Sequence, residues 1–249
     1  MNFLRPLILA TGFVILWQVL VILTGAPPYI LPGPLPVATA LIEKFPLLLS
    51  HLGTTLAEIL LGLALGTVLG SSAALVMILS PLLKRWMLPV LVISQAIPVF
   101  ALAPILVLWL GYGMASKVAM AVLIIFFPVA SSFYSGMQRT EPDLLELARI
   151  MGARPLAVLR TIIIPSALPA FAAGLRVATA VAPIGAVVGE WVGSSAGLGF
   201  YMLHANARMQ IDVMFAALTV LAATSLALYF IIDRLLARLV YWQPRHGMQ

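Results

Sequence analysis

The sequence predicts an all-α polytopic membrane protein with about six transmembrane helices. Of its 249 residues, 63% are hydrophobic and 9% are charged, whereas roughly a quarter of a typical soluble domain is charged. The mean hydropathy is +1.12, and long apolar runs recur along the whole chain. The polar segments between these runs are too short to bury a core of their own. We therefore expect residues 1–249 to form a single transmembrane domain.

The first apolar run covers residues 7–25 and follows Arg5. A cleaved signal peptide is the alternative interpretation, but the apolar core of a signal peptide is usually ~7–15 residues long. A proline-rich loop follows the run, in place of a cleavage site of the A-x-A type. We expect a retained first membrane span.

Five further runs are long enough to cross the roughly 30 Å hydrocarbon core as helices. They cover residues 53–79, 86–110, 117–135, 167–190 and 213–232. Within the second span, Gly62, Gly66 and Gly70 recur every four residues. Such a ridge allows a neighbouring helix to approach closely, and that helix can belong to the same subunit or to a second copy. The third span contains three prolines, which predict kinks.

Residues 136–165 form the longest polar interruption of the chain. Thr140 followed by Asp143 predicts a helix N-cap with an acidic first turn. The next apolar residues share one stripe of a short amphipathic helix; they are Leu144, Leu147, Ala148 and Met151. Gly152 predicts the end of this helix and Pro155 the start of a second one. A helical hairpin with one apolar side is typical of a docking element for a soluble partner.

The basic residues concentrate on one side of the membrane when the N-terminus is placed inside. Ten of the fourteen then fall in inner segments: Arg5, Lys84, Arg85, Arg139, Arg149, Arg154, Arg160, Arg234, Arg238 and Arg245. Three fall in outer segments: Lys44, Lys117 and Arg208. This bias follows the positive-inside rule, so both termini and residues 136–165 are expected in the cytoplasm. The net charge of +6 is explained by topology, and we expect no nucleic-acid partner.

The residues Glu146-Leu147-Ala148, followed by Gly152 and later by Pro165, resemble the EAA loop of ABC importer permeases. Leu147 stands where the pattern has alanine. The resemblance implies the type I ABC importer permease fold. It also implies that this loop is the coupling helix that docks on a cytoplasmic ATPase. The resemblance implies a role in ATPase coupling for the motif residues and their neighbours in the loop: Glu146, Leu147, Ala148, Met151, Gly152, Arg154 and Pro165.

Two further stretches resemble the branch of this family that serves nitrate, sulfonates and taurine. They are residues 30–34, ILPGP, and residues 108–117, LWLGYGMASK. Residues 198–210 look closest to permeases for the hydroxymethylpyrimidine precursor of thiamine. The resemblance therefore implies a small polar solute. Hydroxymethylpyrimidine is the first expectation, and an alkanesulfonate, taurine or nitrate is the next.

Four residues within the spans are candidates for the translocation pathway or its gate. An ionisable group at mid-bilayer costs at least ~2.5 kcal/mol and so faces the bundle interior or a cavity. Glu58 and Arg176 can serve the pathway or form structural pairs, and Glu190 can form an outer gate or a structural contact. Pro183 lies in the fifth span among glycines that reduce its bulk.

The chain contains no G-x-x-x-x-G-K-[ST] phosphate loop, so we expect no cofactor in it and no enzymatic activity of its own. The resemblance implies ATP and Mg²⁺ in a separate ATPase dimer and a solute-binding protein outside a bacterial inner membrane. It also implies a second permease copy, as a homodimer surrounded by lipid. The alternatives are a secondary transporter, which would ideally show repeated halves, and a membrane-embedded enzyme. Residues 193–197 fit G-x-S-x-G, but they lie between spans rather than at a strand–turn–helix.

Overall fold

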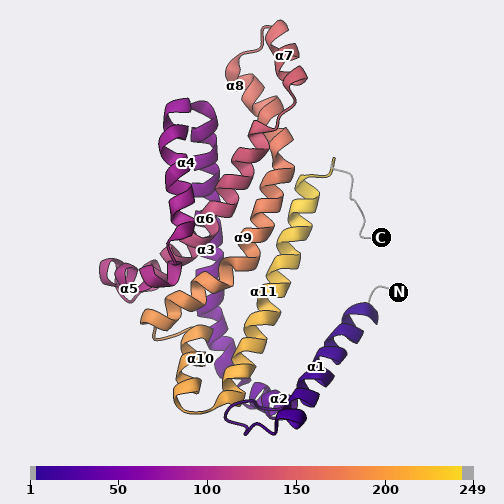
Figure 1. The fold of residues 1–249 in the computed structure, drawn as a ribbon, viewed down its shortest axis with the longest axis vertical. Coiled ribbons are helices and arrows are strands. Elements are labelled where there is room, and N and C mark those ends of the chain that lie inside the picture. The colour runs from indigo at the N-terminus through magenta and orange to yellow at the C-terminus, as the bar shows by residue number, and fades with distance from the viewer. Residues whose placement is uncertain (1–3, 243–249) are drawn as a thin grey trace.

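The computed structural model describes the backbone of residues 4–242 and the side chains of residues 8–94 and 97–242. In these ranges the chain is helical and contains no strand, which confirms the predicted fold class. Its elements are α1 (Leu4–Thr24), α2 (Pro34–Glu43), α3 (Phe45–Leu79), α4 (Pro81–Ala96), α5 (Val99–Leu110), α6 (Met114–Gln138), α7 (Pro142–Ile150), α8 (Pro155–Val158), η1 (Leu159–Ile163), α9 (Ile164–Gly193), α10 (Leu198–Ala207) and α11 (Ile211–Leu239). Long helices form an elongated bundle with α7 and α8 at one end and α2 and α10 at the other (Figure 1).

Within the described residues, four helical rods are long and apolar enough to cross a membrane: α3, α6, α11 and the continuous rod of α8, η1 and α9. The spans expected at residues 53–79, 117–135 and 167–190 lie within the first, second and fourth of these rods. The span expected at residues 213–232 lies within α11. At 1.5 Å per residue, the 35-residue α3 is about 52 Å long and exceeds the hydrocarbon core of about 30 Å.

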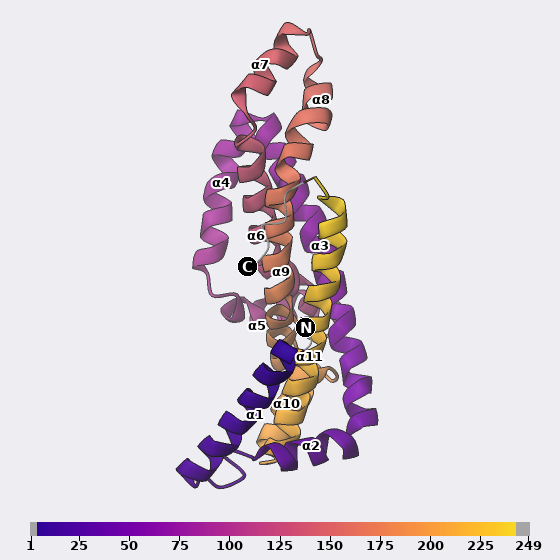
Figure 2. The ribbon, with the colours of Figure 1, turned by 90° about the vertical axis from the view of Figure 1, so that its right-hand side faces the viewer.

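The expected third span over residues 86–110 is not one straight helix. It is a pair of helices, α4 and α5, bent by 103°. Ile97, which precedes Pro98, has ψ of 121° and lies outside both helices. A residue before proline is sterically pushed out of the helical region, so Pro98 breaks the span. Pro89 and Pro104 remain inside α4 and α5. Figures 1 and 2 show α5 lying across the bundle rather than along it.

The close approach of α3, α6 and α9 forms the centre of the bundle. A Cβ atom added at Gly62 of α3 would lie 2.4 Å from the Cβ of Ala121 in α6. A Cβ atom added at Gly185 of α9 would lie 2.6 Å from the Cα of the same Ala121. Gly66 and Gly70 continue the contact of α3 with α6. The predicted glycine ridge therefore packs within the subunit, where close packing leaves no room for a side chain. It is not available to a second copy.

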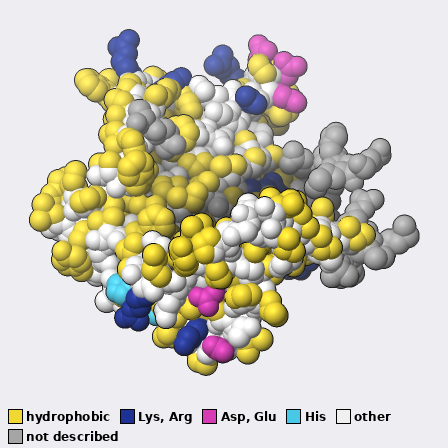
Figure 3. Space-filling view, turned by 60° about the horizontal axis from the view of Figure 1, so that its bottom comes forward, with side chains coloured by type: hydrophobic (Ala, Val, Ile, Leu, Met, Phe, Trp, Pro, Cys, Tyr) yellow, Lys and Arg dark blue, Asp and Glu magenta, His cyan; other side chains and the backbone are white. Residues whose placement is uncertain are grey.

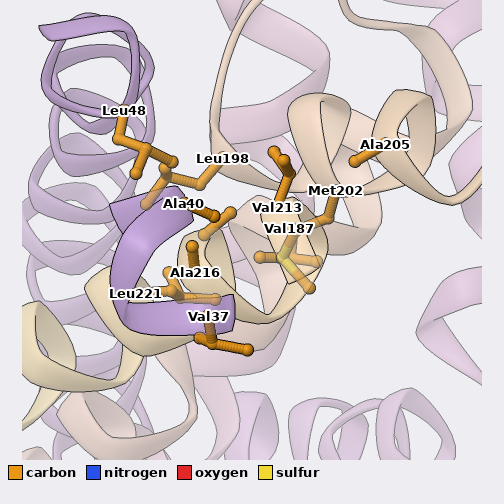
Figure 4. Close-up of a cluster of buried hydrophobic side chains, with 11 residues drawn as sticks. Val37, Ala40, Leu48, Val187, Leu198, Met202, Ala205, Val213, Ala216 and Leu221 are labelled. Atoms are coloured by element: carbon orange, nitrogen blue, oxygen red, sulfur yellow. The ribbon is translucent and has the colours of Figure 1, made fainter. Parts of the chain in front are cut away.

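A cluster of buried apolar side chains closes the end of the bundle that carries α10 (Figure 4). It joins α2, α3, α9, α10 and α11. Its members are Val37, Ala40, Leu48, Val187, Leu198, Met202, Ala205, Val213, Ala216, Ala217 and Leu221. Since these segments are far apart in the sequence, the cluster fixes the short helices α2 and α10 on the ends of the long ones.

The rod Pro155–Gly193 changes its helical form near one end. Its residues Leu159–Ile163 have π-helical hydrogen bonding, and α-helix precedes and follows them. A π turn contains more residues than an α turn, and such turns are rare and short. Figures 1 and 2 show the rod carrying α8, and with it α7, beyond the end of α11.

The first helix, α1, diverges from the bundle (Figure 2). Trp17 attaches it, because the indole ring stacks on Phe215 of α11 with ring centroids 5.7 Å apart. The indole Nε1 also donates a hydrogen bond to the carbonyl oxygen of Pro32 at 3.1 Å. Figure 3 turns the end that carries α2 and α10 toward the viewer; hydrophobic side chains make up much of this face, and charged side chains lie on it in small groups. Large apolar side chains are also exposed along the long helices, among them Val68 of α3 and Phe230 of α11, which suits a protein whose flanks contact lipid.

The packing around Ala121 predicts that Gly62→Val destabilises the fold. The valine side chain would overlap α6, and overpacking of this kind typically costs about 1–3 kcal/mol. We expect a lower melting temperature of the purified protein in detergent, measured by size-exclusion chromatography after heating. The matched control is Gly53→Val in the same helix, since a Cβ at Gly53 meets no atom within 4 Å. Equal melting temperatures for the two variants would contradict the proposed role of the ridge.

Candidate functional site

The turn of the helical hairpin is a Schellman motif at the end of α7. The amide of Ala153 donates to the carbonyl oxygen of Ala148 at 3.0 Å, and the amide of Gly152 donates to the carbonyl oxygen of Arg149 at 3.0 Å. Gly152 has φ of +68°, a left-handed conformation that glycine adopts at least cost. The predicted helix end at Gly152 is confirmed, and α8 starts three residues later at Pro155.

The base of the hairpin is closed by Thr140, which was expected to cap α7. The prediction was wrong: Glu141 is the N-cap residue, and it makes no side-chain cap bond. The hydroxyl of Thr140 is buried, lies 3.0 Å from Oγ of Ser166 in α9 and donates to the carbonyl oxygen of Met137 at 2.9 Å. These contacts compete with the local cap for the same hydroxyl. As a result, the end of α6 is tied to the start of α9.

The hairpin exposes large apolar side chains. The exposed fractions are 54% for Leu147, 75% for Met151 and 79% for Ile150. Leu156 of α8 is also exposed. Grouped apolar side chains on a short protruding element are typical of a docking surface for another protein. We call these four residues the hairpin surface.

The residues predicted for ATPase coupling divide into two groups. Glu146, Leu147, Met151, Gly152 and Arg154 are exposed. Ala148 is buried, and Pro165 at the start of α9 is partly buried. The sequence reasoning missed Ile150 and Leu156 of the hairpin surface. The spacing of Ile150 three residues after Leu147 is the signal that places it on the same side of α7.

At the opposite end of the bundle, side chains of α3 cap the helix α10. The amide of Gly197 donates to Nδ1 of His51 at 3.1 Å. The amide of Leu198 donates to Oγ1 of Thr55 at 2.8 Å. The first amides of a helix have no acceptor within the helix and need partners from elsewhere. Burial also raises the pKa of Tyr201, whose ring stacks on His51 with centroids 4.9 Å apart.

Glu190, near the end of α9, caps the next two amides of α10. Its Oε2 accepts hydrogen bonds from the amides of Gly199 and Phe200, and its Oε1 accepts one from the hydroxyl of Thr55 at 2.6 Å. The carboxylate thus lies at the positive end of the α10 dipole. A Cβ added at Gly197 would lie 2.2 Å from the Glu190 carboxyl group, so this approach requires glycine there.

The four predicted pathway residues are all buried or paired inside the subunit. Glu58 and Glu190 are each 1% exposed, and Glu190 is hydrogen-bonded to Thr55, one helical turn before Glu58 in α3. Arg176 forms an ion pair of 2.6 Å with Asp233 of α11, which agrees with the structural pairing considered for it. The sixth span is predicted to end at residue 232, but α11 continues past Asp233 to Leu239. Pro183 is buried inside α9.

Sequence reasoning also missed Lys117, which was counted as an outer surface charge. Only 3% of Lys117 is exposed, and its Nζ donates to the carbonyl oxygens of Tyr112 and Gly113. Gly189 of α9 packs against its side chain. Lys117 therefore fixes the turn between α5 and α6. The charge count cannot reveal this burial, because it depends on a glycine that is 72 residues away in the sequence.

A polar hollow of about 390 Å³ opens on the bundle surface between α6 and α9. Small side chains and one arginine line it: Ser131, Ser132, Ser135, Gly136, Arg139, Ala170 and Ala173. Ser131, Ser132 and Ser135 lie within the expected span 117–135, where hydroxyl groups are unfavourable against lipid, whereas Arg139 lies just past the end of α6. This face is therefore suited to a water-filled path or to contact with another subunit.

The chain is similar to known proteins along most of its length. A family model for the inner membrane component of binding-protein-dependent transport systems matches residues 66–241. A probable ABC transporter permease protein of Haemophilus influenzae is 53% identical over 96% of this chain and 97% of its own. The formylaminopyrimidine transport permease protein ThiX of Halalkalibacterium halodurans is 37% identical over 97% of each chain.

The fold is also similar to that of a solved structure. A chain of the inward-facing MetNI methionine ABC transporter superposes with a TM-score of 0.68, covering 80% of this chain and 98% of that one. The sequence identity of this pair is 21%, so the similarity concerns the fold alone.

The capping of α10 predicts that Gly197→Ala displaces this helix. The added methyl group would collide with Glu190, and Gly197 has φ of +109°, which disfavours alanine. We expect a lower melting temperature and faster proteolysis of the chain around residues 194–210. The control is Gly111→Ala, where φ is +79° but no atom lies within 4 Å of the added Cβ. If both variants behave alike, backbone strain alone explains the effect and the contact with Glu190 is not required.

Proposed function

The chain belongs to the family of inner membrane components of binding-protein-dependent transport systems, and on this premise we propose that its α7–α8 hairpin receives the motion of an ATPase. The protein is the permease subunit of an ABC importer, and such permeases work with an ATPase and a solute-binding protein. The observation that carries the coupling proposal is the hairpin surface. It exposes apolar side chains at the tip of a rod that continues into the centre of the bundle.

The mechanical link runs from the hairpin surface to Ala121. The rod Pro155–Gly193 carries the hairpin at one end and Gly185 near the other. The other helix of the hairpin, α7, follows α6, and the hydrogen bond between Thr140 and Ser166 joins the end of α6 to the same rod. A displacement of the hairpin is then passed to α6 and α9 together. The ATPase must bind the hairpin differently in two states of the permease, because equal binding would shift no equilibrium.

We place the hairpin in the cytoplasm with both termini on the same side. The excess of basic residues in the segments assigned to that side supports this orientation. The opposite end, with α2 and α10, then faces the solute-binding protein. ATP and Mg²⁺ are assigned to a separate ATPase dimer, and the permease contributes no catalytic residue.

The pathway is proposed to lie along the polar hollow between α6 and α9, between two copies of the subunit. In a homodimer the second copy would shield the hydroxyl groups of Ser131, Ser132 and Ser135 from lipid. This shielding is favourable because exposing polar groups to lipid is costly. Glu58, Glu190, Arg176 and Pro183 are then assigned to positioning helices rather than to contact with the solute. Their partners inside the subunit support this assignment.

The solute is proposed to be a pyrimidine precursor of thiamine. The similarity to a formylaminopyrimidine permease over nearly the whole of both chains supports this class. The three serine hydroxyls in the lining of the hollow also suit an uncharged polar ring, since hydroxyls both donate and accept hydrogen bonds.

The hairpin surface predicts that Met151→Asp uncouples the permease. Met151 is 75% exposed, so the variant should fold and insert normally. A buried unpaired charge at the docking contact should reduce co-purification of the ATPase and solute-stimulated ATP hydrolysis by about tenfold or more. The matched control for co-purification of the ATPase is Met209→Asp at the opposite end, where the methionine is 65% exposed. Normal ATPase binding by the Met151 variant would overturn the coupling proposal.

The proposed solute class is tested by uptake into proteoliposomes that contain permease, ATPase and binding protein. We expect ATP-dependent accumulation of labelled hydroxymethylpyrimidine, with competition by formylaminopyrimidine and not by taurine. Preferential accumulation of taurine or an alkanesulfonate would overturn the solute class while leaving the permease function intact. Accumulation without ATPase would instead indicate a secondary transporter.

A further inference from the structure

Two acidic side chains, Glu58 of α3 and Glu190 of α9, are neighbours where these helices hold α10. Each is 1% exposed. Glu190 accepts a hydrogen bond from Thr55 of α3 at 2.6 Å, and Glu58 lies one helical turn after Thr55 on the same side of α3, which brings the two carboxyl groups together. Two ionised carboxylates in contact repel each other, and the repulsion is strong in a buried site that is shielded from water. A hydrogen bond between two carboxyl groups also requires a proton on one of them.

The hydrogen bonds of Glu190 show that it is the ionised partner. Its Oε1 accepts from the hydroxyl of Thr55 at 2.6 Å, and its Oε2 accepts from the amides of Gly199 and Phe200. The two amides can only donate, and the hydroxyl of Thr55, which also lies 3.3 Å from the carbonyl oxygen of His51, donates to Glu190 over the shorter distance. An ionised carboxylate can accept from all of them, whereas a proton on either oxygen would take up an acceptor position. The N-terminal end of α10 also favours a negative charge at Glu190.

The surroundings of Glu58 have the opposite character. Its Oε2 is buried and has no hydrogen-bond partner in the described part of the chain. An ionised carboxylate with one bare buried oxygen would be strongly destabilised, whereas the carbonyl oxygen of a neutral acid tolerates this better.

The charged and titratable side chains around the pair leave it without a salt bridge. Lys117 of α6 directs its Nζ to the carbonyl oxygens of Tyr112 and Gly113. On α3, Nδ1 of His51 accepts a hydrogen bond from the amide of Gly197 and is therefore not protonated. No ion pair to Glu58 or Glu190 is found among the described residues.

We propose that Glu58 and Glu190 form a binding site for a single proton. The proton resides on Glu58, whose carboxylic O–H donates to the Glu190 carboxylate. Through Glu190 it fastens α10 to both α3 and α9. Glu58 is thus a positioning residue for the end of the bundle that faces away from the hairpin. The proton site stands on the geometry alone, and only its effect on uptake depends on the proposed function.

The experiment compares the two amide substitutions. Glu58→Gln retains a donor, because the amide N–H can replace the carboxylic O–H toward Glu190. It should keep the melting temperature close to that of the unsubstituted protein. Glu190→Gln replaces one acceptor oxygen with an NH₂ group that faces existing donors. It should lower the melting temperature and reduce uptake by about tenfold, as expected for one lost charge-assisted hydrogen bond in a buried site. Equal damage from both substitutions would overturn the proposal.

Infrared spectroscopy of the purified permease–ATPase complex observes the proton directly. The unsubstituted protein should show the carbonyl stretching band of a buried protonated carboxyl group, shifted by exchange into D₂O. The band should be absent in Glu58→Gln and present in the control Glu43→Gln, whose side chain is exposed. A protein without this band, or one whose band survives Glu58→Gln, would overturn the proposal even if a variant fails to fold. A stability or uptake that requires a monovalent metal cation would show that a cation replaces the proton, and would also overturn it.

Discussion

The contact of three helices at Ala121 is the constraint on which the rest of this structure depends. Gly62 and Gly185 bring α3 and α9 against the same alanine of α6, closer than any side chain would permit. In a membrane, packing of this kind replaces much of the hydrophobic driving force that holds a soluble core together. Because the three rods are fixed to one another here, features at their opposite ends become geometrically related.

At each end, the fixed helices present a different kind of element. One end of the rod Pro155–Gly193 carries the hairpin surface, whose apolar side chains are largely exposed. The other end carries Glu190, whose carboxylate is fully satisfied by α3 and α10. The first arrangement suits a partner that binds and releases, and the second suits a helix that must remain in place or move as a unit with α9.

The sequence was sufficient for the class of fold and for the hairpin, because both depend on local signals. Apolar runs identify helices 53–79 and 213–232, and the glycine at 152 ends α7 through its own backbone geometry. The cap of α7 and the burial of Lys117 were missed, because Ser166 and Gly189 supply the deciding contacts from distant segments. The bend at Pro98 was expected only as a kink. Its angle of 103° depends on how α5 packs against α6 and α9, which no local pattern specifies.

The short π-helical segment Leu159–Ile163 connects α8 of the hairpin to α9. Successive residues of an α-helix are offset by about 100° around the axis. One residue more or fewer in this segment would therefore turn α8 by about a quarter of a revolution relative to α9, and the connection of α7 to α6 would oppose that turn. The length of this five-residue segment therefore constrains the orientation of the hairpin surface relative to α9. A change in the length of this segment would alter how the hairpin surface is presented to the ATPase of the proposed complex.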